Sequence, residues 1–422
     1  MNVYAWIILI ALLAEYGLNL ATSALNLKAL RTPLPDAFRD VFDREEYRQS
    51  QAYTRAQTRF EWVSSTFHLA VLLAFWFAGG FEWLDTWMRG FGWGPVVTGV
   101  AYIGALGLAR GALSLPFSIY GTFGIEERFG FNETTPKTFA LDLLKGTALG
   151  IVLGGPLLAA ILWFFGATGP YGWVYAWIAV TAFSLILQYV APRYLMPIFN
   201  DFEPLDEGDL RSAILDYADT VDFAVDDVYV MDGSRRSSKS NAFFTGFGSN
   251  RRIVLFDTLI EQHTVDELLT VVAHEIGHYK RKHIPQRMAI SVAHTGVLFL
   301  LLSIFLQVDG LYAAFFVDQM SVYTGLLFFG LLYTPAEMLI SIPMQMLSRA
   351  HEFEADRFAI CTTGKARAFI DALKKLAANN LANLTPHPWY VFLYYSHPPM
   401  LKRIRAIREA ASTPAEPDPV SA

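Results

Sequence analysis

The chain has 422 residues, of which 53% are hydrophobic and 15% aromatic, while only 17% are charged. The mean hydropathy of +0.32 is too high for an ordinary soluble enzyme and indicates a membrane protein. The net charge of −6 gives no reason to expect a nucleic-acid partner, and the single cysteine, Cys361, excludes an internal disulfide and a thiolate-rich metal site.

Seven stretches are long and apolar enough to cross a bilayer, which takes about 20 mostly apolar residues. In chain order they cover residues 4–25, 64–84, 95–120, 147–167, 173–198, 287–307 and 322–347. The first has no charged n-region and no small-residue cleavage site, so we predict a retained helix and not a signal peptide.

The segments between these spans define the predicted domains. The first five spans make up a membrane part over residues 1–199, with polar loops at 27–63 and 121–146. A soluble domain follows at 200–286, the last two spans occupy 287–347, and a soluble helical remainder covers 348–411. Residues 412–422 have the composition of a disordered tail.

Basic residues predict the orientation of these spans. The loop 27–63 carries seven Lys and Arg residues and the loop 121–146 carries Arg128, Lys137 and Lys145, whereas the loop 308–321 carries none. Because basic loops stay in the cytoplasm, we expect the N-terminus outside and both soluble segments on the cytoplasmic side.

A metal-binding motif lies in the soluble segment. Thr264 and Glu267 form a predicted capping box, so a helix should begin near Thr264. His274 and His278 are four residues apart and project from one face about 6 Å from each other, which suits two ligands of one zinc ion. Glu275 points away from that face toward a water molecule, as in the HExxH helix of metalloproteases. The alternative is a pair of histidines on an ordinary helix.

Short strands surround this motif. We predict a helix at 206–221 and strands at 228–231, 253–256 and 240–246, the last ending in a turn at Gly246. Zinc peptidases commonly bind an extended substrate along such an edge strand. The pattern alone favours the plainer alternative, in which the strands are only scaffold.

A third ligand is expected just past the seventh span. Glu352 and Asp356 are four residues apart on a predicted helix and share a face, whereas Glu354 points about 160° away. We predict that Glu352 binds zinc and that Asp356 orients a ligating histidine. His351 is a rival ligand, and Glu352 as an ordinary solvated charge is the alternative to both.

Polar side chains inside the spans need an explanation, because their exposure to lipid costs free energy. These are Glu15, Asn19, Arg110, His294 and Glu337. We expect a hydrated chamber connected to the zinc site, and the competing hypothesis is a dry bundle in which they pair with one another.

The order of the motifs resembles the integral-membrane type-I CAAX prenyl proteases. The similar stretches are 124–132, 197–205, 239–246, 252–259, 274–278, 348–359 and 396–403. The resemblance implies a mostly α polytopic fold, with seven transmembrane helices around a chamber closed by a cytoplasmic zinc domain that contains a small β element. It also implies that Asn241 and Ala242 lie on the substrate-binding strand and that His397 and Arg403 line the active site.

We therefore expect a zinc endopeptidase with one ion per chain, held by His274, His278 and Glu352. Glu275 would act as general base, and His397 would supply a donor to the oxyanion. The substrate would be a peptide or the C-terminus of a prenylated protein, shortened by three residues, with the bilayer as the other partner and the oligomeric state left open.

The tail carries no retention signal, which favours a bacterial inner membrane over the endoplasmic reticulum. A quality-control membrane endopeptidase and a non-catalytic membrane scaffold are the alternative functions. The presence of Glu275 argues against the scaffold.

Overall fold

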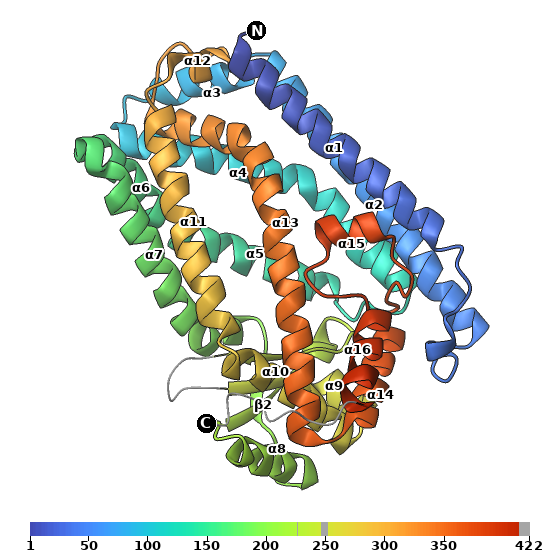
Figure 1. Cartoon of the computed structure of the whole chain (residues 1–422). Coiled ribbons are helices and arrows are strands. Elements are labelled where there is room, and N and C mark those ends of the chain that lie inside the picture. The colour runs from blue at the N-terminus through green and yellow to red at the C-terminus, as the bar shows by residue number, and fades with distance from the viewer. Residues whose placement is uncertain (226, 246–251, 413–422) are drawn as a thin grey trace.

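The computed structural model describes residues 1–225, 227–245 and 252–412, which form a long helical assembly with a small sheet at one end (Figure 1). Seven of the described helical segments are long and apolar enough to cross a membrane, which confirms the predicted number. They are Val3–Ala29, Arg44–Phe77, Pro95–Glu126, Pro136–Ala167, Gly169–Ile198, His283–Phe305 and Val322–Thr363.

Most of these segments are built from labelled α-helices, namely α1 (Val3–Ala29), α2 (Arg44–Phe77), α4 (Pro95–Tyr120), α5 (Pro136–Leu149), α6 (Gly155–Ala167), α7 (Gly172–Val190), α11 (His283–Phe305) and α13 (Val322–Thr363). Turns of π-helix at Gly121–Glu126, Gly150–Gly154 and Ala191–Leu195 extend α4, join α5 to α6 and extend α7. Two short helices, α3 (Gly80–Arg89) and α12 (Asp309–Ala313), lie near the N-terminus at the upper end of Figure 1.

The second span begins and ends earlier than the sequence predicts. Asp43 and Glu46 form a capping box, so α2 starts at Arg44, inside the stretch 27–63 that was expected to be a loop. The helix ends at Phe77, and Gly79 follows it in the left-handed conformation with a φ of +73°. The predicted span at 64–84 is therefore wrong at both ends, and its last residues belong to α3.

The stretch 121–146 is also more helical than predicted. Thr135 accepts a hydrogen bond from the backbone N–H of Thr138 and Pro136 takes the first helical position, so α5 begins there. Two of the three charged residues of α5 have partners at the membrane border, because Asp142 pairs with Arg236 and Lys145 donates to the carbonyl of Ile198. A polar stretch can thus continue directly into the fourth span.

Helix α13 connects the membrane to the soluble end. It runs unbroken over 42 residues, with Ser321 as its N-cap and Gly364 after its last turn at a φ of +66°. In Figure 1 it passes from the upper end of the assembly down to the sheet. The predicted border at 347/348 falls inside this helix, so the direction of residues 348–359 is set by the seventh span.

The soluble end contains a four-stranded sheet with the order β1–β2–β4–β3. Its strands are β1 (Phe202–Pro204), β2 (Asp227–Met231), β3 (Ala242–Thr245) and β4 (Arg252–Phe256). β2 and β4 are parallel, and the outer strands β1 and β3 pair antiparallel with them. The three predicted strands are confirmed, the turn at Gly246 lies outside the described residues, and β1 is too short for its pattern to be seen.

The remaining helices are α8 (Asp209–Thr220), α9 (Asp257–Gln262), α10 (Val265–Lys280), α14 (Ala366–Asn379), α15 (Pro388–Tyr394) and α16 (Met400–Ser412). Helix α8 confirms the helix predicted at 206–221, and of the predicted tail only Ser412 is described, as the end of α16. One hydrophobic core joins the sheet to α8, α10, α14, α16 and the end of α13.

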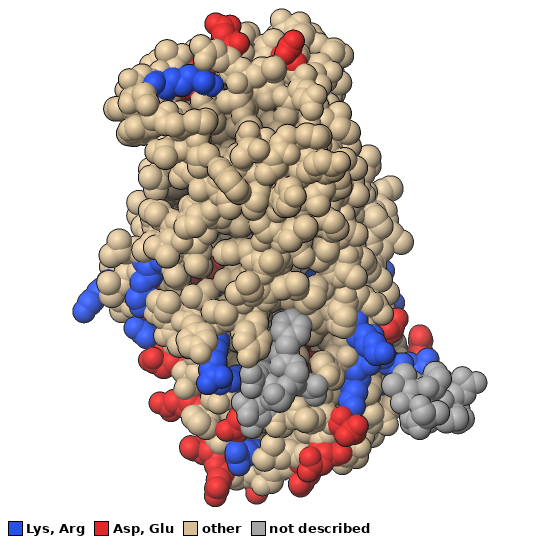
Figure 2. Space-filling model, turned by 90° about the vertical axis from the view of Figure 1, so that its left-hand side faces the viewer, with Lys and Arg blue, Asp and Glu red and all other residues tan. Residues whose placement is uncertain are grey.

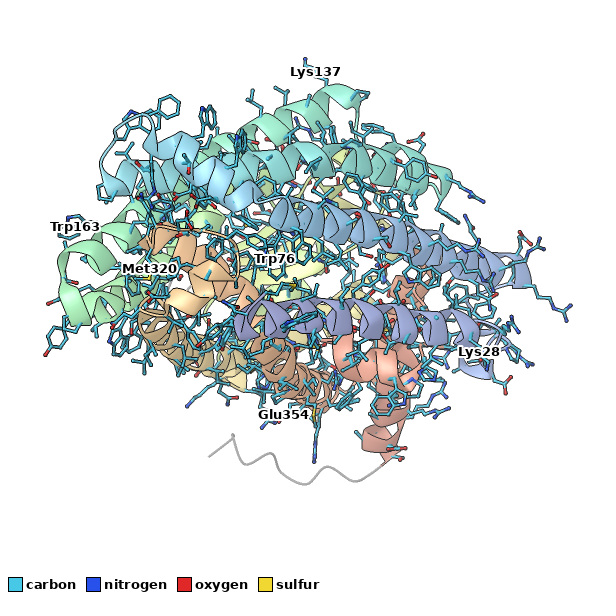
Figure 3. All side chains as sticks on the ribbon, turned by 90° about the horizontal axis from the view of Figure 1, so that it is seen from above. Lys28, Trp76, Lys137, Trp163, Met320 and Glu354 are labelled. Atoms are coloured by element: carbon cyan, nitrogen blue, oxygen red, sulfur yellow. The ribbon has the colours of Figure 1, made fainter. Side chains whose placement is uncertain are left out.

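A second core lies among the membrane helices around Trp76, Phe315 and Phe328. Seen from above, Trp76 lies inside the helical assembly and the exposed Trp163 lies at its edge (Figure 3). Figure 2 shows a broad middle zone almost free of Lys, Arg, Asp and Glu, with most charges around the soluble end. Charged groups avoid hydrocarbon, so this zone is the part of a multi-pass protein that lies in the membrane.

Candidate metal centre

Three side chains of the types that bind metals meet where α10 packs on α13. His274 and His278 of α10 and Glu352 of α13 each offer a ligand atom, and these atoms lie within 4.8 Å of one another. The two Nε2 atoms are 3.2 Å apart, and the Glu352 oxygens lie 3.6 Å from His274 Nε2 and 3.3 Å from His278 Nε2. Tetrahedral ligands at zinc bond lengths of about 2.0–2.1 Å are separated by roughly 3.3 Å, so the spacing suits a metal ion.

The Glu352 carboxylate gives a second reason to expect a cation. Its side chain is buried, and its Oε2 atom has no hydrogen-bond partner. Arg403 Nη1 is 3.7 Å away, beyond hydrogen-bond distance. A buried carboxylate oxygen without a donor is unfavourable by about 1–3 kcal/mol or more, and a metal ion at this position would remove that cost. The residues present therefore fit a metal.

A glycine lets the two helices approach closely enough. Gly277 lies within the motif of α10, and a Cβ at this position would come within 3.2 Å of both the Cα and the carbonyl oxygen of Ala355. The capping box of Thr264 and Glu267 that was predicted for the start of α10 is present. The local sequence thus fixes both where the helix begins and how deeply it sits against α13.

The predicted orienting residue lies on the far side of His274. Asp356 Oδ1 is 2.9 Å from His274 Nδ1, and this leaves Nε2 of the ring pointing at the ligand set. Arg403 holds the same carboxylate with two hydrogen bonds, from Nε to Oδ2 at 2.9 Å and from Nη2 to Oδ1 at 2.5 Å. Arg403 therefore contacts Asp356 most closely, and its Nη2 also lies 3.4 Å from Nδ1 of His274.

These contacts set the charge of the site. Burial alone would lower the pKa of His274, but the carboxylates of Asp356 and Glu352 outweigh burial and raise this pKa to about 9. Burial likewise opposes the charge of Arg403, yet Asp356 raises the pKa of that guanidinium. Because metal ligation requires neutral imidazole, binding of a metal must displace a proton from His274 at neutral pH.

Glu275 lies next to the ligands but does not join them. Its carboxylate makes no hydrogen bond or ion pair within the described part of the chain. Burial raises the pKa of Glu275, and the neighbouring His274 and His278 lower it to a smaller extent. A carboxylate with a raised pKa, whose two oxygens have no hydrogen-bond partner among the described residues, suits a general base that has to take up a proton and release it again.

His397 reaches the site from the loop before α16. Its Nε2 lies 3.4 Å from Glu352 Oε1, and its Nδ1 lies 2.9 Å from the hydroxyl of Ser396. Most of the ring is exposed, which leaves room for a substrate carbonyl beside it. Arg349 of α13 supports this loop, since its Nη1 donates to the carbonyls of Val391 and Tyr395. The role of Arg349 was not predicted.

The predicted substrate strand is an edge of the sheet. Ala242 begins β3 and Asn241 precedes it, with the Asn241 side chain accepting a hydrogen bond from the Ala242 N–H. Within the described residues, β3 pairs with β4 on one side only. Phe244 of β3 stacks edge-on against Tyr279 of α10, which places this strand beside the metal-binding helix. Its free edge is thus available for pairing with an extended chain near the ligands.

A polar cluster fastens the start of this strand to the membrane helices. Lys239 Nζ donates to Glu126 Oε2 and to the Tyr53 hydroxyl, both at 2.6 Å. An isolated β-bridge between Asn132 and Ser237 lies next to it. The stretch 124–132 therefore joins the third span to the segment that leads into β3, a role that the sequence analysis missed because it depends on contacts distant in the chain.

Two residues of the sequence prediction lie away from the ligand set. His351 Nε2 is 3.1 Å from Gln286 Oε1, and its ring stacks on that of His283. Glu354 contacts His283 Nε2 at 3.1 Å. The geometry therefore gathers His274, His278 and Glu352, and leaves His351 in the layer behind them. His283 was not singled out from the sequence.

Four of the five polar groups of the spans divide into two sets. His294 Nε2 lies 3.0 Å from the Tyr333 hydroxyl and 3.4 Å from Glu337, so these groups pair in the way the dry-bundle hypothesis expects. Glu15 and Arg110 are exposed and form no ion pair within the described residues. The hydrated chamber stays a prediction.

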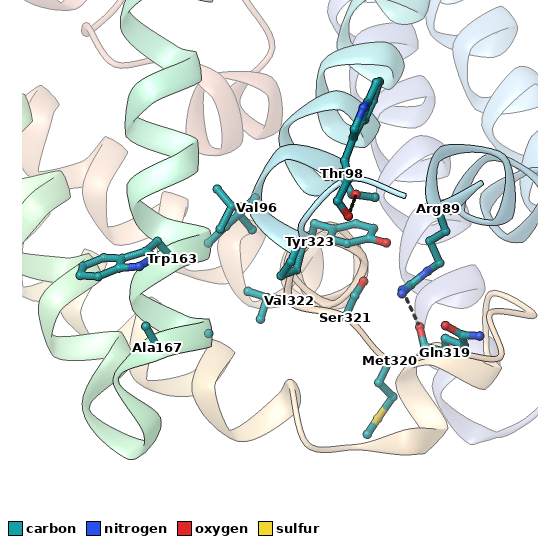
Figure 4. A pocket seen from close by; sticks show the side chains of 14 residues that line it. Arg89, Val96, Thr98, Trp163, Ala167, Gln319, Met320, Ser321, Val322 and Tyr323 are labelled. Atoms are coloured by element: carbon teal, nitrogen blue, oxygen red, sulfur yellow. Dashed lines mark hydrogen bonds between the residues drawn. The ribbon is translucent and has the colours of Figure 1, made fainter. Parts of the chain in front are cut away.

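A separate cavity of about 720 Å³ lies at the other end of the assembly, between Arg89, Trp163 and Tyr323 (Figure 4). The Arg89 side chain pairs with the buried Asp85 and donates to the carbonyl of Gln319. The described residues that line the cavity include no histidine and no carboxylate. It therefore lacks the chemistry of the metal centre.

The fold and the site define a membrane-spanning metallopeptidase. Two family models match the chain: the CAAX prenyl protease N-terminal region with five membrane helices over residues 23–201, and peptidase family M48 over residues 204–411. The chain belongs to this family of membrane metalloproteases.

Similar proteins include CAAX prenyl protease 1 homologues. The one from Arabidopsis thaliana is 36% identical over 90% of this chain and 92% of its own length, and the Saccharomyces cerevisiae protein is 32% identical over 90% and 89%. The crystal structure of S. mikatae Ste24p is 30% identical with a TM-score of 0.92, covering 96% of this chain and 99% of the other. The predicted fold class, enzyme class and family resemblance are confirmed.

Proposed function

We propose that this protein is a zinc endopeptidase that cleaves the C-terminal peptide of prenylated, CAAX-type proteins. One zinc ion per chain would be held by His274, His278 and Glu352. The observation that carries the metal proposal is the convergence of two Nε2 atoms and a buried carboxylate oxygen without a partner. The names of the similar proteins support the substrate class.

Bound zinc supplies a Lewis acid that polarises the scissile carbonyl and acidifies water. Side chains of the protein carry out the remaining steps. Glu275 takes the proton of the attacking water and delivers it to the leaving amine. His397 donates a hydrogen bond to the developing oxyanion from the exposed side of the site. Asp356 and Arg403 act as positioning residues, because they hold His274 in one tautomer and orientation.

The substrate would bind as an added strand. The free edge of β3 supports this proposal, with Asn241 and Ala242 at the end nearest the cluster of Lys239 and Glu126. A chamber among the spans would receive the prenylated end, since exposed polar groups such as Glu15 and Arg110 favour water and the surrounding helices offer apolar walls.

A mass-spectrometric comparison of two peptides tests the substrate class. One peptide carries a prenylated CAAX cysteine, and the other has the same sequence without the lipid. We expect the purified full-length protein to remove the last three residues of the prenylated peptide and to cleave its partner much more slowly. Glu275→Gln protein serves as the control for contaminating proteases. Equal cleavage of both peptides, or cleavage at internal sites, would favour a quality-control endopeptidase instead.

The proposed topology has an external N-terminus and a cytoplasmic metal centre. It is supported by the seven Lys and Arg residues of the stretch 27–63. Single cysteines introduced at the exposed positions Arg31 and Asp318, in a Cys361→Ser background, test it by labelling in intact cells. We expect an impermeant maleimide to label position 318 and to spare position 31. The reverse pattern would contradict the topology. The bacterial inner membrane stays a sequence-based prediction.

A further inference from the structure

We propose that His283 is a positioning residue for the metal ligand His278, accepting a hydrogen bond from its Nδ1–H and thereby directing its Nε2 at the metal. Nδ1 of His278 lies 3.0 Å from Nδ1 of His283, while Nε2 of His278 faces His274 and Glu352. The inference rests on the proposed role of His278 as a ligand, and it assigns a function to a residue that lies outside the HExxH motif.

The two ligating histidines differ in what lies behind them. His274 has the Asp356 carboxylate at its Nδ1, and Asp356 is in turn paired with Arg403. His278 has no carboxylate within hydrogen-bond distance of its Nδ1 among the described residues, and the ring of His283 takes that place. A ligating histidine nearly always donates its other N–H to a fixed acceptor, and His283 supplies this acceptor for His278.

The number of protons fixes the direction of the hydrogen bond. A His278 ring that binds metal through Nε2 must carry its proton on Nδ1, so Nδ1 donates. His283 then accepts at Nδ1 and carries its own proton on Nε2. That nitrogen lies 3.1 Å from Glu354 Oε2, which accepts a hydrogen bond from the Nε2–H of His283. The opposite direction would place a proton on Nε2 of His278 and prevent it from ligating.

The fold holds His283 firmly in this place. It is the first residue of α11, and Lys282 before it adopts a left-handed conformation with a φ of +59°, which turns the chain back toward α10. The His283 ring is 2% exposed. One face of the His283 ring stacks on the ring of His351, with ring centroids 3.9 Å apart and planes within 8° of parallel. Stacking and the Glu354 contact together restrict the rotation of the ring.

Zinc affinity tests this role independently of peptide cleavage. The full-length protein is stripped of metal and titrated with Zn²⁺ against a chromophoric chelator. Loss of a group that orients a ligand typically weakens metal binding about 10–100-fold, and we expect this for His283→Gln. We expect His283→Asn to bind zinc nearly as tightly as the wild type, because the Asn oxygen occupies the position of Nδ1 while the longer Gln side chain places its oxygen elsewhere.

The Asn and Gln variants form a matched pair, since both replace the ring by a primary amide. His263→Asn is the control for loss of a buried histidine distant from the ligands, and we expect no change in its affinity. Equal zinc affinities for His283→Asn and His283→Gln, whether both weak or both strong, would overturn the inference. A wild-type protein that binds no zinc would instead contradict the proposed function itself.

Discussion

Replacing Glu275 by Gln is expected to keep the metal and to lower kcat by about 10²–10⁴-fold or more, the loss typical of removing a general base. The amide cannot accept a proton, whereas its size and polarity match the carboxylate. Glu275 is not among the three ligand side chains, so the ligand set stays complete in this variant. Single-turnover cleavage measured together with zinc content checks both halves of the prediction.

Glu261→Gln is a suitable control for the Glu275 variant, because it makes the same change on α9, outside the ligand set. We expect wild-type kcat and zinc content for it. A Glu275→Gln enzyme with near-normal kcat would contradict the assignment of the base. A variant that loses zinc would mean that Glu275 acts on the metal itself.

Replacing Glu352 by Ala is expected to abolish both stable zinc binding and cleavage. The change removes one of three protein ligands, and it leaves the two imidazoles to hold the ion without a compensating negative charge. Elemental analysis of the purified variant should show a zinc content far below one per chain. The same analysis applies to His274→Ala and His278→Ala, for which we expect the same result.

Glu354→Ala is the matched control for Glu352→Ala, because it removes the other glutamate of the same helical turn without removing a ligand. We expect Glu354→Ala to retain zinc, with at most a weakened affinity through His283. Full zinc occupancy in Glu352→Ala would move the ligand role to another side chain, and His351 would be the first to examine.

The grouping of the candidate ligands could be predicted because it depends on local periodicity. His274 and His278 repeat with the helical spacing, and so do Glu352 and Asp356. The structure brings these two pairs together on α10 and α13. Their proximity follows from Gly277, whose missing side chain lets the helices touch.

His283 could not be found in the same way. It lies five residues after His278 and beyond a turn at Lys282, so no single helical period connects the two rings. The contact of Lys239 with Glu126 and Tyr53 joins three separate segments of the chain and leaves no local pattern either. A sequence signal does exist for both, since His283 follows the HExxH motif closely and the stretch 124–132 resembles the family.

The number of membrane spans was predicted correctly, but the positions of their ends were predicted less well. Apolar composition marks the middle of each span, but capping residues and ion pairs decide where the helices begin and end. Asp43 and Thr135 start α2 and α5 well before the apolar stretches begin. The ion pair of Asp142 with Arg236 allows charged residues to occupy helix at the membrane border.

Zinc titration of metal-free enzyme is the most direct test of the account. The full-length protein is stripped with a chelator, and cleavage of the prenylated peptide is followed as zinc is added back. We expect no cleavage in the stripped protein, and a linear rise to full activity that ends at one zinc per chain. Cleavage that survives complete removal of metal, or that reaches its plateau only at two or more zinc ions per chain, would contradict a single zinc centre at His274, His278 and Glu352.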